Sequence, residues 1–95
     1  MGEMQWRMPQ PGERPEAVLR DGLTVADVAE ALDRPPGLSL QIRLNELMLA
    51  VIAPAGPGLV AALLHRQDDS FIWVVMRAQL AGPNEISQWN RRMGA

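Results

Sequence analysis

The chain has 95 residues, of which 47% are hydrophobic, and its formal net charge is −2 at pH 7. This length allows one small domain with a single modest core, and the composition excludes a disordered chain. The acidic balance argues against a protein that binds nucleic acid by charge alone. No apolar run is long enough to span a bilayer, and the first residues lack the pattern of a signal peptide. We therefore expect a cytoplasmic protein without a membrane partner.

Two short strands are predicted at the start of the chain. Residues 4–8 alternate apolar and polar side chains, which is the two-residue period of a strand. The prolines and glycine of residues 9–12 predict a turn. Residues 17–20 then predict a second strand, and a short helix over residues 16–20 is the open alternative. Asp21-Gly22 is a turn signal that leads into the next element.

One helix is well signalled. Thr24 is a good N-cap, and Asp27 three residues later completes a pair similar to a capping box. Four apolar residues at helical spacing form one stripe that needs a sheet to cover it: Val25, Val28, Ala29 and Leu32. The break at residues 35–37, Pro-Pro-Gly, ends the helix near Leu32 or Asp33.

Four further stretches carry a strand signal or an apolar run: residues 38–44, 47–53, 59–64 and 70–79. The first alternates apolar and polar side chains and predicts a half-buried strand. The second and third are apolar throughout, so each fits a buried strand or part of a helix, and periodicity does not decide. The fourth is rich in aromatic and β-branched residues and is the strongest strand signal in the chain. A short helical tail is predicted from Asn84 onward, and we expect it either to dock or to fray. The residues at helical spacing that would dock this tail are Ile86, Trp89 and Met93.

The order of these elements predicts an α+β fold, in which a crossover helix covers one face of a mixed sheet of four to five strands. Residues 14–46, RPEAVLRDGLTVADVAEALDRPPGLSLQIRLNE, resemble the hairpin, helix and third strand of ubiquitin-like sulfur carriers of the thiamine and molybdopterin type. Residues 69–82, DSFIWVVMRAQLAG, resemble the last strand of those carriers and of ubiquitin. The resemblance covers residues 4–82 and implies a β-grasp domain over residues 1–82. Residues 83–95 would then be a C-terminal extension.

The resemblance implies a ubiquitin-like protein modifier or sulfur carrier that is not itself an enzyme. Gly82 takes the place of the family's terminal glycine, and Ala81 takes the place of its neighbour. In the family, an activating enzyme uses ATP to adenylate that carboxylate, so the carrier binds no cofactor stably. The implied partners are this activating enzyme, a conjugation target and a peptidase that removes the extension. In an uncut chain, Ala95 would carry the reactive carboxylate.

The last strand also predicts a docking surface. If Ile72 and Val74 face the helix, the residues that alternate with them, Phe71, Trp73 and Val75, face outward. The resemblance to ubiquitin implies that this face is a patch for a partner. This predicted patch consists of Phe71, Trp73, Val75 and Arg77. The alternative is that other elements cover it. All nine basic residues are arginine, which indicates either an arginine-rich genome or a carrier that cannot be modified on its own side chains.

No group of side chains suggests catalysis or metal binding. The chain has no cysteine, and His65 is its single histidine, in a polar loop without positioned partners. Asp68 and Asp69 are adjacent carboxylates without further oxygen ligands. The serines that lack a nearby base are Ser39, Ser70 and Ser87. We therefore predict no catalytic residue and no metal site.

Two other functions remain open. A non-catalytic protein-interaction or secretion-chaperone-like module would dock its tail helix on a partner. A winged-helix DNA-binding protein would use residues 24–32 as its second helix and residues 38–53 as its recognition helix. Only Gln41 and Arg43 in that segment could read bases, and the segment alternates like a strand. We therefore expect no nucleic-acid partner.

Overall fold

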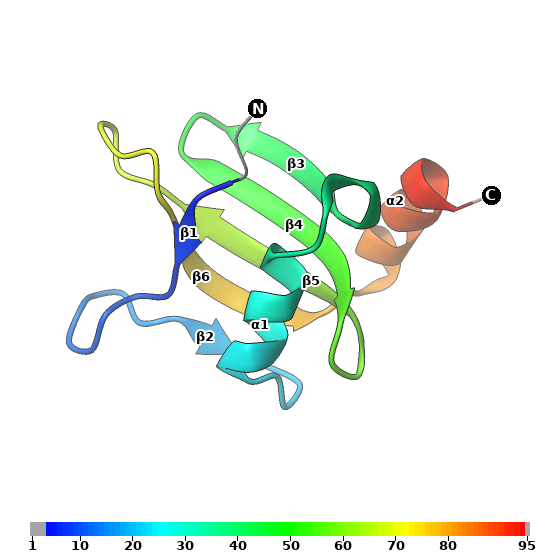
Figure 1. Ribbon diagram of the computed structural model, residues 1–95, viewed down its shortest axis with the longest axis horizontal. Coiled ribbons are helices and arrows are strands. Elements are labelled where there is room, and N and C mark those ends of the chain that lie inside the picture. The colour runs from blue at the N-terminus through cyan, green and yellow to red at the C-terminus, as the bar shows by residue number, and fades with distance from the viewer. Residues whose placement is uncertain (1–3, 95) are drawn as a thin grey trace.

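The computed structural model describes residues 4–94 and contains one mixed sheet of six strands with two α-helices (Figure 1). The strands are β1 (Trp6–Arg7), β2 (Val18–Leu19), β3 (Leu40–Asn45), β4 (Met48–Ala55), β5 (Gly58–His65) and β6 (Trp73–Leu80). The helices are α1 (Val25–Leu32) and α2 (Pro83–Met93), and a single 3₁₀ turn, η1, spans Pro36–Leu38. The predicted α+β class is confirmed. Among residues 4–94, no helix is long and apolar enough to cross a membrane.

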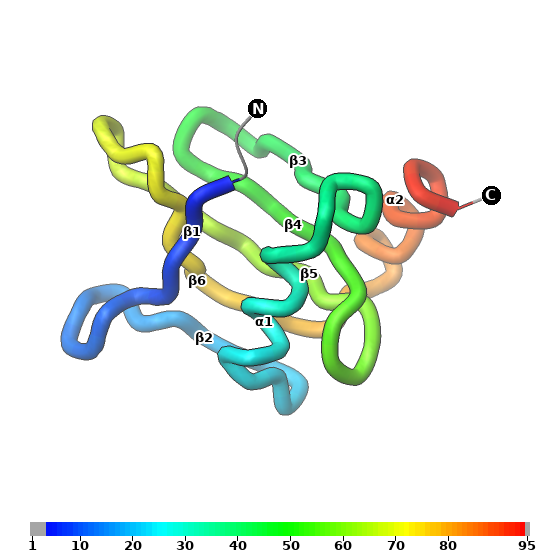
Figure 2. The backbone as a smooth tube through the Cα atoms, viewed as in Figure 1, coloured from blue at the N-terminus to red at the C-terminus, as the bar shows by residue number. Residues whose placement is uncertain are grey.

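The sheet is built on an antiparallel meander of β3, β4, β5 and β6. β1 and β2 both pair in parallel with β6, so that Trp6 lies opposite Trp73 and Val18 lies opposite Arg77. The two short strands therefore follow one another along one edge, and Figure 2 shows the loop that leaves this edge between them. The hairpin before the helix that the resemblance implies is not formed, because β1 and β2 each pair with β6 and not with one another. Prolines at three positions within residues 9–15 remove backbone donors from the connection, which keeps both strands short.

The two apolar stretches that periodicity left open are the strands β4 and β5. A two-residue turn, Gly56-Pro57, joins them, and Gly56 has a φ of 53°. A Cβ at Gly56 would lie 2.5 Å from Oδ1 of Asp27, so this turn requires glycine for both conformation and space. Because β3 and β4 together occupy residues 40–55, the recognition helix that the winged-helix alternative requires is absent, and that alternative is wrong.

Helix α1 covers one side of the sheet, which we name the front face (Figure 1). The predicted capping box is confirmed: the backbone N–H of Asp27 donates to Oγ1 of Thr24 at 3.2 Å, and that of Thr24 donates to Oδ2 of Asp27 at 3.0 Å. The predicted stripe is only partly correct. Val28 and Leu32 are buried, but Val25 in the first turn is 52% exposed. Ala31 is buried instead, because it continues the row of side chains three residues beyond Val28.

The core lies between α1 and the front face. The sheet residues buried there are Leu49, Val51, Ala53, Ala55, Val60, Ala62, Leu64, Trp73, Val75 and Ala78. Neighbouring residues along each strand point to the opposite side, which we name the back face. On the back face, Ile42, Ala50 and Leu63 line a recess together with Glu85 and Gln88 of α2. The two helices therefore lie on opposite faces, with α2 beside β3.

The end of α1 is tied to the turn between β4 and β5. The backbone N–H of Gly56 donates to Oε1 of Glu30 at 3.0 Å. Arg34 Nε donates to the carbonyl oxygen of Pro54 at 2.9 Å, and its Nη2 lies 2.8 Å from Oε2 of Glu30. These bonds fix the end of α1 relative to the turn between β4 and β5. Beyond this end, α1 no longer covers the front face.

Candidate functional site

An open groove of about 940 Å³ lies on the front face beside the end of α1. The helix stops at Leu32 because Pro35 and Pro36 cannot continue it, so no helix covers the front side chains of β3. One wall is the end of α1 with η1, and the other is formed by the segments that precede β1 and β6. We name this space the front groove. Its lining includes Leu32, Pro36, Gln41, Arg43, Phe71 and Trp73.

Trp73 forms the floor of the front groove. The residue is only 9% exposed, and two guanidinium groups lie near its ring. The Cζ atoms of Arg43 and Arg66 are 5.3 Å and 5.2 Å from the ring centroid. Both distances allow cation–π contact, which is worth about 0.5–1 kcal/mol at exposed sites. The groove therefore combines an aromatic floor with the positive charge of Arg43, and Arg66 adds a second charge near the same ring from outside the groove lining.

Backbone carbonyl groups, not carboxylates, hold these two arginines. Arg43 Nε donates to the carbonyl oxygen of Asn45 at 3.0 Å, and Arg66 Nε donates to that of Glu46 at 2.9 Å. Arg66 Nη1 also donates to the carbonyl oxygen of Ser70 at 3.1 Å. Within residues 4–94, no carboxylate forms an ion pair with either arginine. Their charge is therefore available to an anionic group.

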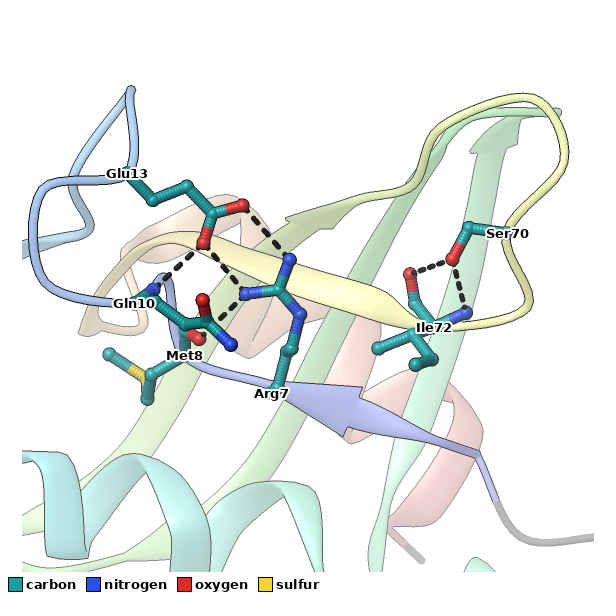
Figure 3. Close-up of polar contacts among 6 residues, drawn as sticks. All are labelled: Arg7, Met8, Gln10, Glu13, Ser70 and Ile72. Atoms are coloured by element: carbon teal, nitrogen blue, oxygen red, sulfur yellow. Dashed lines mark hydrogen bonds and ion pairs between the residues drawn. The ribbon is translucent and has the colours of Figure 1, made fainter.

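Phe71 lies at the rim of the front groove and is 82% exposed. The strand β6 begins only at Trp73, and the backbone N–H of Ile72 donates to Oγ of Ser70 at 3.0 Å (Figure 3). This local turn keeps Phe71 outside the sheet. A large aromatic side chain left in water beside a groove is typical of an anchor for a partner.

Trp6 connects the two walls of the front groove. Its Nε1 donates to Oδ1 of Asp33 at 2.8 Å. Trp6 belongs to β1 and packs against the core, while Asp33 is the C-cap of α1. The bond therefore fixes the end of the helix relative to the segment that precedes β1.

The structure brings together two of the four residues of the predicted patch. Phe71 and Trp73 line the front groove, whereas Val75 is fully buried in the core and Arg77 lies on the back face. The orientation predicted for Trp73 and Val75 is therefore wrong. Alternation has the same period whichever side faces the helix, so it cannot assign the face. A bulge in β6 at Met76 then shifts the register, so that Arg77 points away from α1.

The residues predicted for C-terminal activation lie at the start of α2. The backbone N–H of Ala81 donates to the carbonyl oxygen of Leu59 at 2.8 Å, which extends the pairing of β5 with β6. Gly82 is the N-cap of α2: its N–H donates to Oε1 of Glu85 at 2.7 Å, and its carbonyl oxygen accepts from Ile86 N at 2.9 Å. Gly82 is half-buried. Ala95 lies outside the described residues.

The predicted tail helix exists and begins one residue earlier than expected, at Pro83. Of its predicted docking residues, Trp89 and Met93 are half-buried, while Ile86 is 43% exposed. The helix contacts β3. α2 is therefore docked on its own domain through part of its apolar side.

A small polar pocket of about 90 Å³ lies at the other edge of the sheet, near β1. Arg7 forms a two-bond pair with Glu13, at 2.7 Å and 2.9 Å, and the N–H of Gln10 donates to Oε1 of Glu13 at 2.8 Å (Figure 3). The hydrogen bonds from Arg7, followed by that from Gln10, lower the pKa of Glu13 to about 2. The guanidinium of Arg7 is therefore already neutralised, and its role is to hold the loop after β1.

His65 lines the same small pocket, as does Ser70. The Ser70 hydroxyl accepts from Ile72 N at 3.0 Å, and no hydrogen bond from it to His65 is formed. Within the described range 4–94, no group of three or more histidines and carboxylates could hold a metal ion. These residues therefore form no recognisable catalytic arrangement.

Sequence reasoning missed Arg43 and Arg66 as members of the site. Arg43 lies on β3 and Arg66 directly follows β5, and both reach the Trp73 ring of β6 because β3, β4, β5 and β6 pair in order. No local pattern signals such a contact. A comparison of the chain with protein-family models, with curated proteins and with solved structures found no match.

Proposed function

We propose that the protein is a non-enzymatic protein-interaction module that binds an acidic, extended segment of a partner protein in the front groove. The observation that carries this proposal is Phe71, 82% exposed, in the same groove as Trp73 and Arg43. The guanidinium groups of Arg43 and Arg66 both lie near the Trp73 ring, and neither forms an ion pair with a carboxylate of residues 4–94. Aromatic residues and arginine are the residue types enriched at protein interfaces and at their energetic centres.

Charge selects the kind of partner. The chain carries a net charge of −2, yet the lining of the front groove contains two arginines and a single acid, Asp33. Of the two arginines, Arg34 is paired with Glu30, so Arg43 carries the positive charge that is left for a partner. Asp33 already accepts a hydrogen bond from Trp6. A carboxylate of the partner would meet Arg43, which can form two parallel hydrogen bonds with it. An apolar side chain next to this carboxylate would pack between Phe71 and the ring of Trp73.

The experiment is selection of short peptides from a random displayed library on the immobilised protein. We expect the selected peptides to share an acidic residue close to an aromatic or aliphatic residue, and their affinity to fall as salt rises. The substitutions Phe71→Ala and Arg43→Glu should each abolish selection. The matched control is Arg77→Glu, which makes the same charge change at an exposed position on the back face.

Two results would overturn the proposal. One is the absence of any enriched peptide at low salt. The other is a set of enriched peptides that bind Arg43→Glu as tightly as the unchanged protein but are lost with Arg77→Glu. The second result would place the binding surface on the back face.

A β-grasp carrier is the second candidate, and the connection after the last strand favours it. β6 runs directly into Ala81-Gly82, the pair at the position implied by the resemblance. A cut after Gly82 would release its carboxylate and remove α2, which starts at Pro83. This function therefore requires the domain to remain folded after it loses α2.

Intact mass of the protein purified from its native cells tests the carrier function. A carrier predicts a chain that ends at Gly82, with a free carboxylate or a thiocarboxylate. Detection of only the full-length chain, together with no ATP-dependent adenylation of a chain truncated at Gly82, would exclude it. Neither result affects peptide selection by the front groove, so the two candidates are tested separately.

A further inference from the structure

The strand β3 is the outer strand of the sheet on the side away from β1 and β2 (Figure 1). The direction in which the backbone groups of β3 point can be followed from one bond beside β4. Arg66 N donates to the carbonyl oxygen of Leu47 at 3.0 Å, so the backbone carbonyl of Leu47 points toward β5. The backbone N–H and C=O groups of successive residues point to alternate sides of a strand, so those of Ala50 point toward its partner Ile42 on β3. The backbone groups of Gln41 and Arg43 therefore point away from the sheet. Within residues 4–94, no backbone hydrogen bond joins them to another segment on that side.

Exposed apolar side chains are concentrated at this edge. Leu44, on β3 itself, is 54% exposed. Leu38 and Leu47, which flank the two ends of the strand, are 47% and 38% exposed. An unpaired edge bordered by apolar side chains is a template for another strand, and natural proteins protect such edges with charges, prolines or covering segments. Features of that kind on β3 are the charge of Arg43, the contact with α2 on the back face and the bulge between Arg43 and Asn45. Among residues 4–94, the outward backbone groups of Gln41 and Arg43 nevertheless have no backbone partner.

We propose that two copies of this chain pair through their β3 strands, antiparallel, about a two-fold axis that passes beside Ile42. Ile42 then lies opposite Ile42 of the partner subunit, and Gln41 lies opposite Arg43 of the partner subunit. The outward backbone groups of Gln41 and Arg43 meet their counterparts, which gives hydrogen-bonded pairs on both sides of the axis. The two six-stranded sheets become one continuous sheet with an isologous interface.

The side chains agree with this register on both faces. On the back face, Leu40 meets Leu44 of the partner subunit, and Ile42 meets its own counterpart, so the apolar residues form a continuous ladder. On the front face, each arginine at position 43 meets a neutral glutamine. A register centred one residue later would place Arg43 opposite Arg43 of the partner subunit, and like charges directly opposite are destabilising. Charge therefore favours the axis at Ile42.

The pairing has a consequence for the front groove. Gln41 and Arg43 line this groove, so the two grooves of the dimer adjoin across the axis. A partner with two acidic segments would then gain from effective concentration. The dimer itself does not depend on what the groove binds.

Cysteine cross-linking tests the register directly, because the chain has no cysteine of its own. In Ile42→Cys the two thiols would face each other in a non-hydrogen-bonded pair, where Cα atoms are about 4.5 Å apart, within the range that a disulfide spans. We expect mild oxidation to give a covalent dimer. Gln41→Cys alone and Arg43→Cys alone should form no disulfide between chains, because in each case the two cysteines do not face each other. A mixture of the two variants should give a covalent dimer that contains one chain of each.

A second variant tests the edge itself. The backbone N–H that Gln41→Pro removes points away from the sheet, so the pairing of β3 with β4 is kept. By light scattering after gel filtration, the unchanged protein should have twice the chain mass of 10.5 kDa at high concentration. Gln41→Pro should have the mass of one chain while its circular dichroism spectrum is unchanged. Failure of Ile42→Cys to cross-link, or self-cross-linking of Gln41→Cys at the same rate, would overturn the proposal.

Discussion

The hydrogen bond between Trp6 and Asp33 provides a quantitative test of how the front groove is held open. Trp6→Phe keeps an aromatic ring on β1 but removes the indole N–H, which donates to Asp33 Oδ1 at 2.8 Å. We expect the free energy of unfolding to fall. The groove wall formed by the end of α1 would also lose its fixed position relative to the segment before β1.

The magnitude follows from the environment of the bond. A hydrogen bond to a charged group contributes about 1.5–3 kcal/mol, and one between neutral groups about 0.5–1.5 kcal/mol. Asp33 is exposed and regains water when the bond is lost, so the lower range applies, and we expect a coupling energy of about 1 kcal/mol. For a domain of this size, that corresponds to a fall of about 4–8 °C in Tm.

A double-mutant cycle in urea isolates this coupling energy. The variants are Trp6→Phe, Asp33→Ala and the double variant, and Asp33→Asn is the matched control because it keeps the acceptor oxygen. Asp33→Asn should retain most of the coupling. If the effects of Trp6→Phe and Asp33→Ala add within about 0.3 kcal/mol, the bond does not couple the two walls, and the reasoning is refuted.

Two further predictions concern the loops around the sheet. Gly56→Ala should lower the free energy of unfolding by about 1–2 kcal/mol, because Gly56 has a φ of 53° and a Cβ there would displace Asp27 from the helix cap. The measurement is urea unfolding, and an unchanged midpoint would contradict this prediction. Glu13→Gln tests the pair with Arg7. The folded pKa of Glu13 is about 2, below its ordinary value of 4.5, so the pair stabilises the fold above about pH 4.5 and loses this contribution as the pH falls toward 2. The difference in stability between the unchanged protein and Glu13→Gln should therefore shrink over that interval, and a difference independent of pH would contradict the assignment.

The parts of the fold that the sequence predicts are those determined by neighbouring residues. The cap formed by Thr24 and Asp27 depends on residues three apart, and it is present. The alternation that predicts β3 is likewise local. The prediction for the faces of Trp73 and Val75 is wrong because these faces depend on which side α1 covers, and that side is set by contacts distant in sequence. The apolar runs of β4 and β5 are ambiguous locally because both strands are central in the sheet.

The candidate site was predictable only in part for the same reason. Phe71 and Trp73 lie in one strongly patterned segment, so the sequence predicts them together. Arg43 and Arg66 reach the ring of Trp73 only after β3, β4, β5 and β6 have paired. Which charges surround an aromatic residue is therefore a property of the folded sheet.

The central claim is that a partner segment occupies the front groove, and an NMR titration of the ¹⁵N-labelled protein with a selected peptide tests it most directly. The chain has three tryptophans, so the indole N–H of Trp73 on the groove floor can be compared with that of Trp89 on α2 in the same spectrum. We predict that the Trp73 indole signal and the backbone amide signal of Phe71 shift with peptide concentration, while the Trp89 signal stays in place. A shift of Trp89 with Trp73 unchanged would contradict the account.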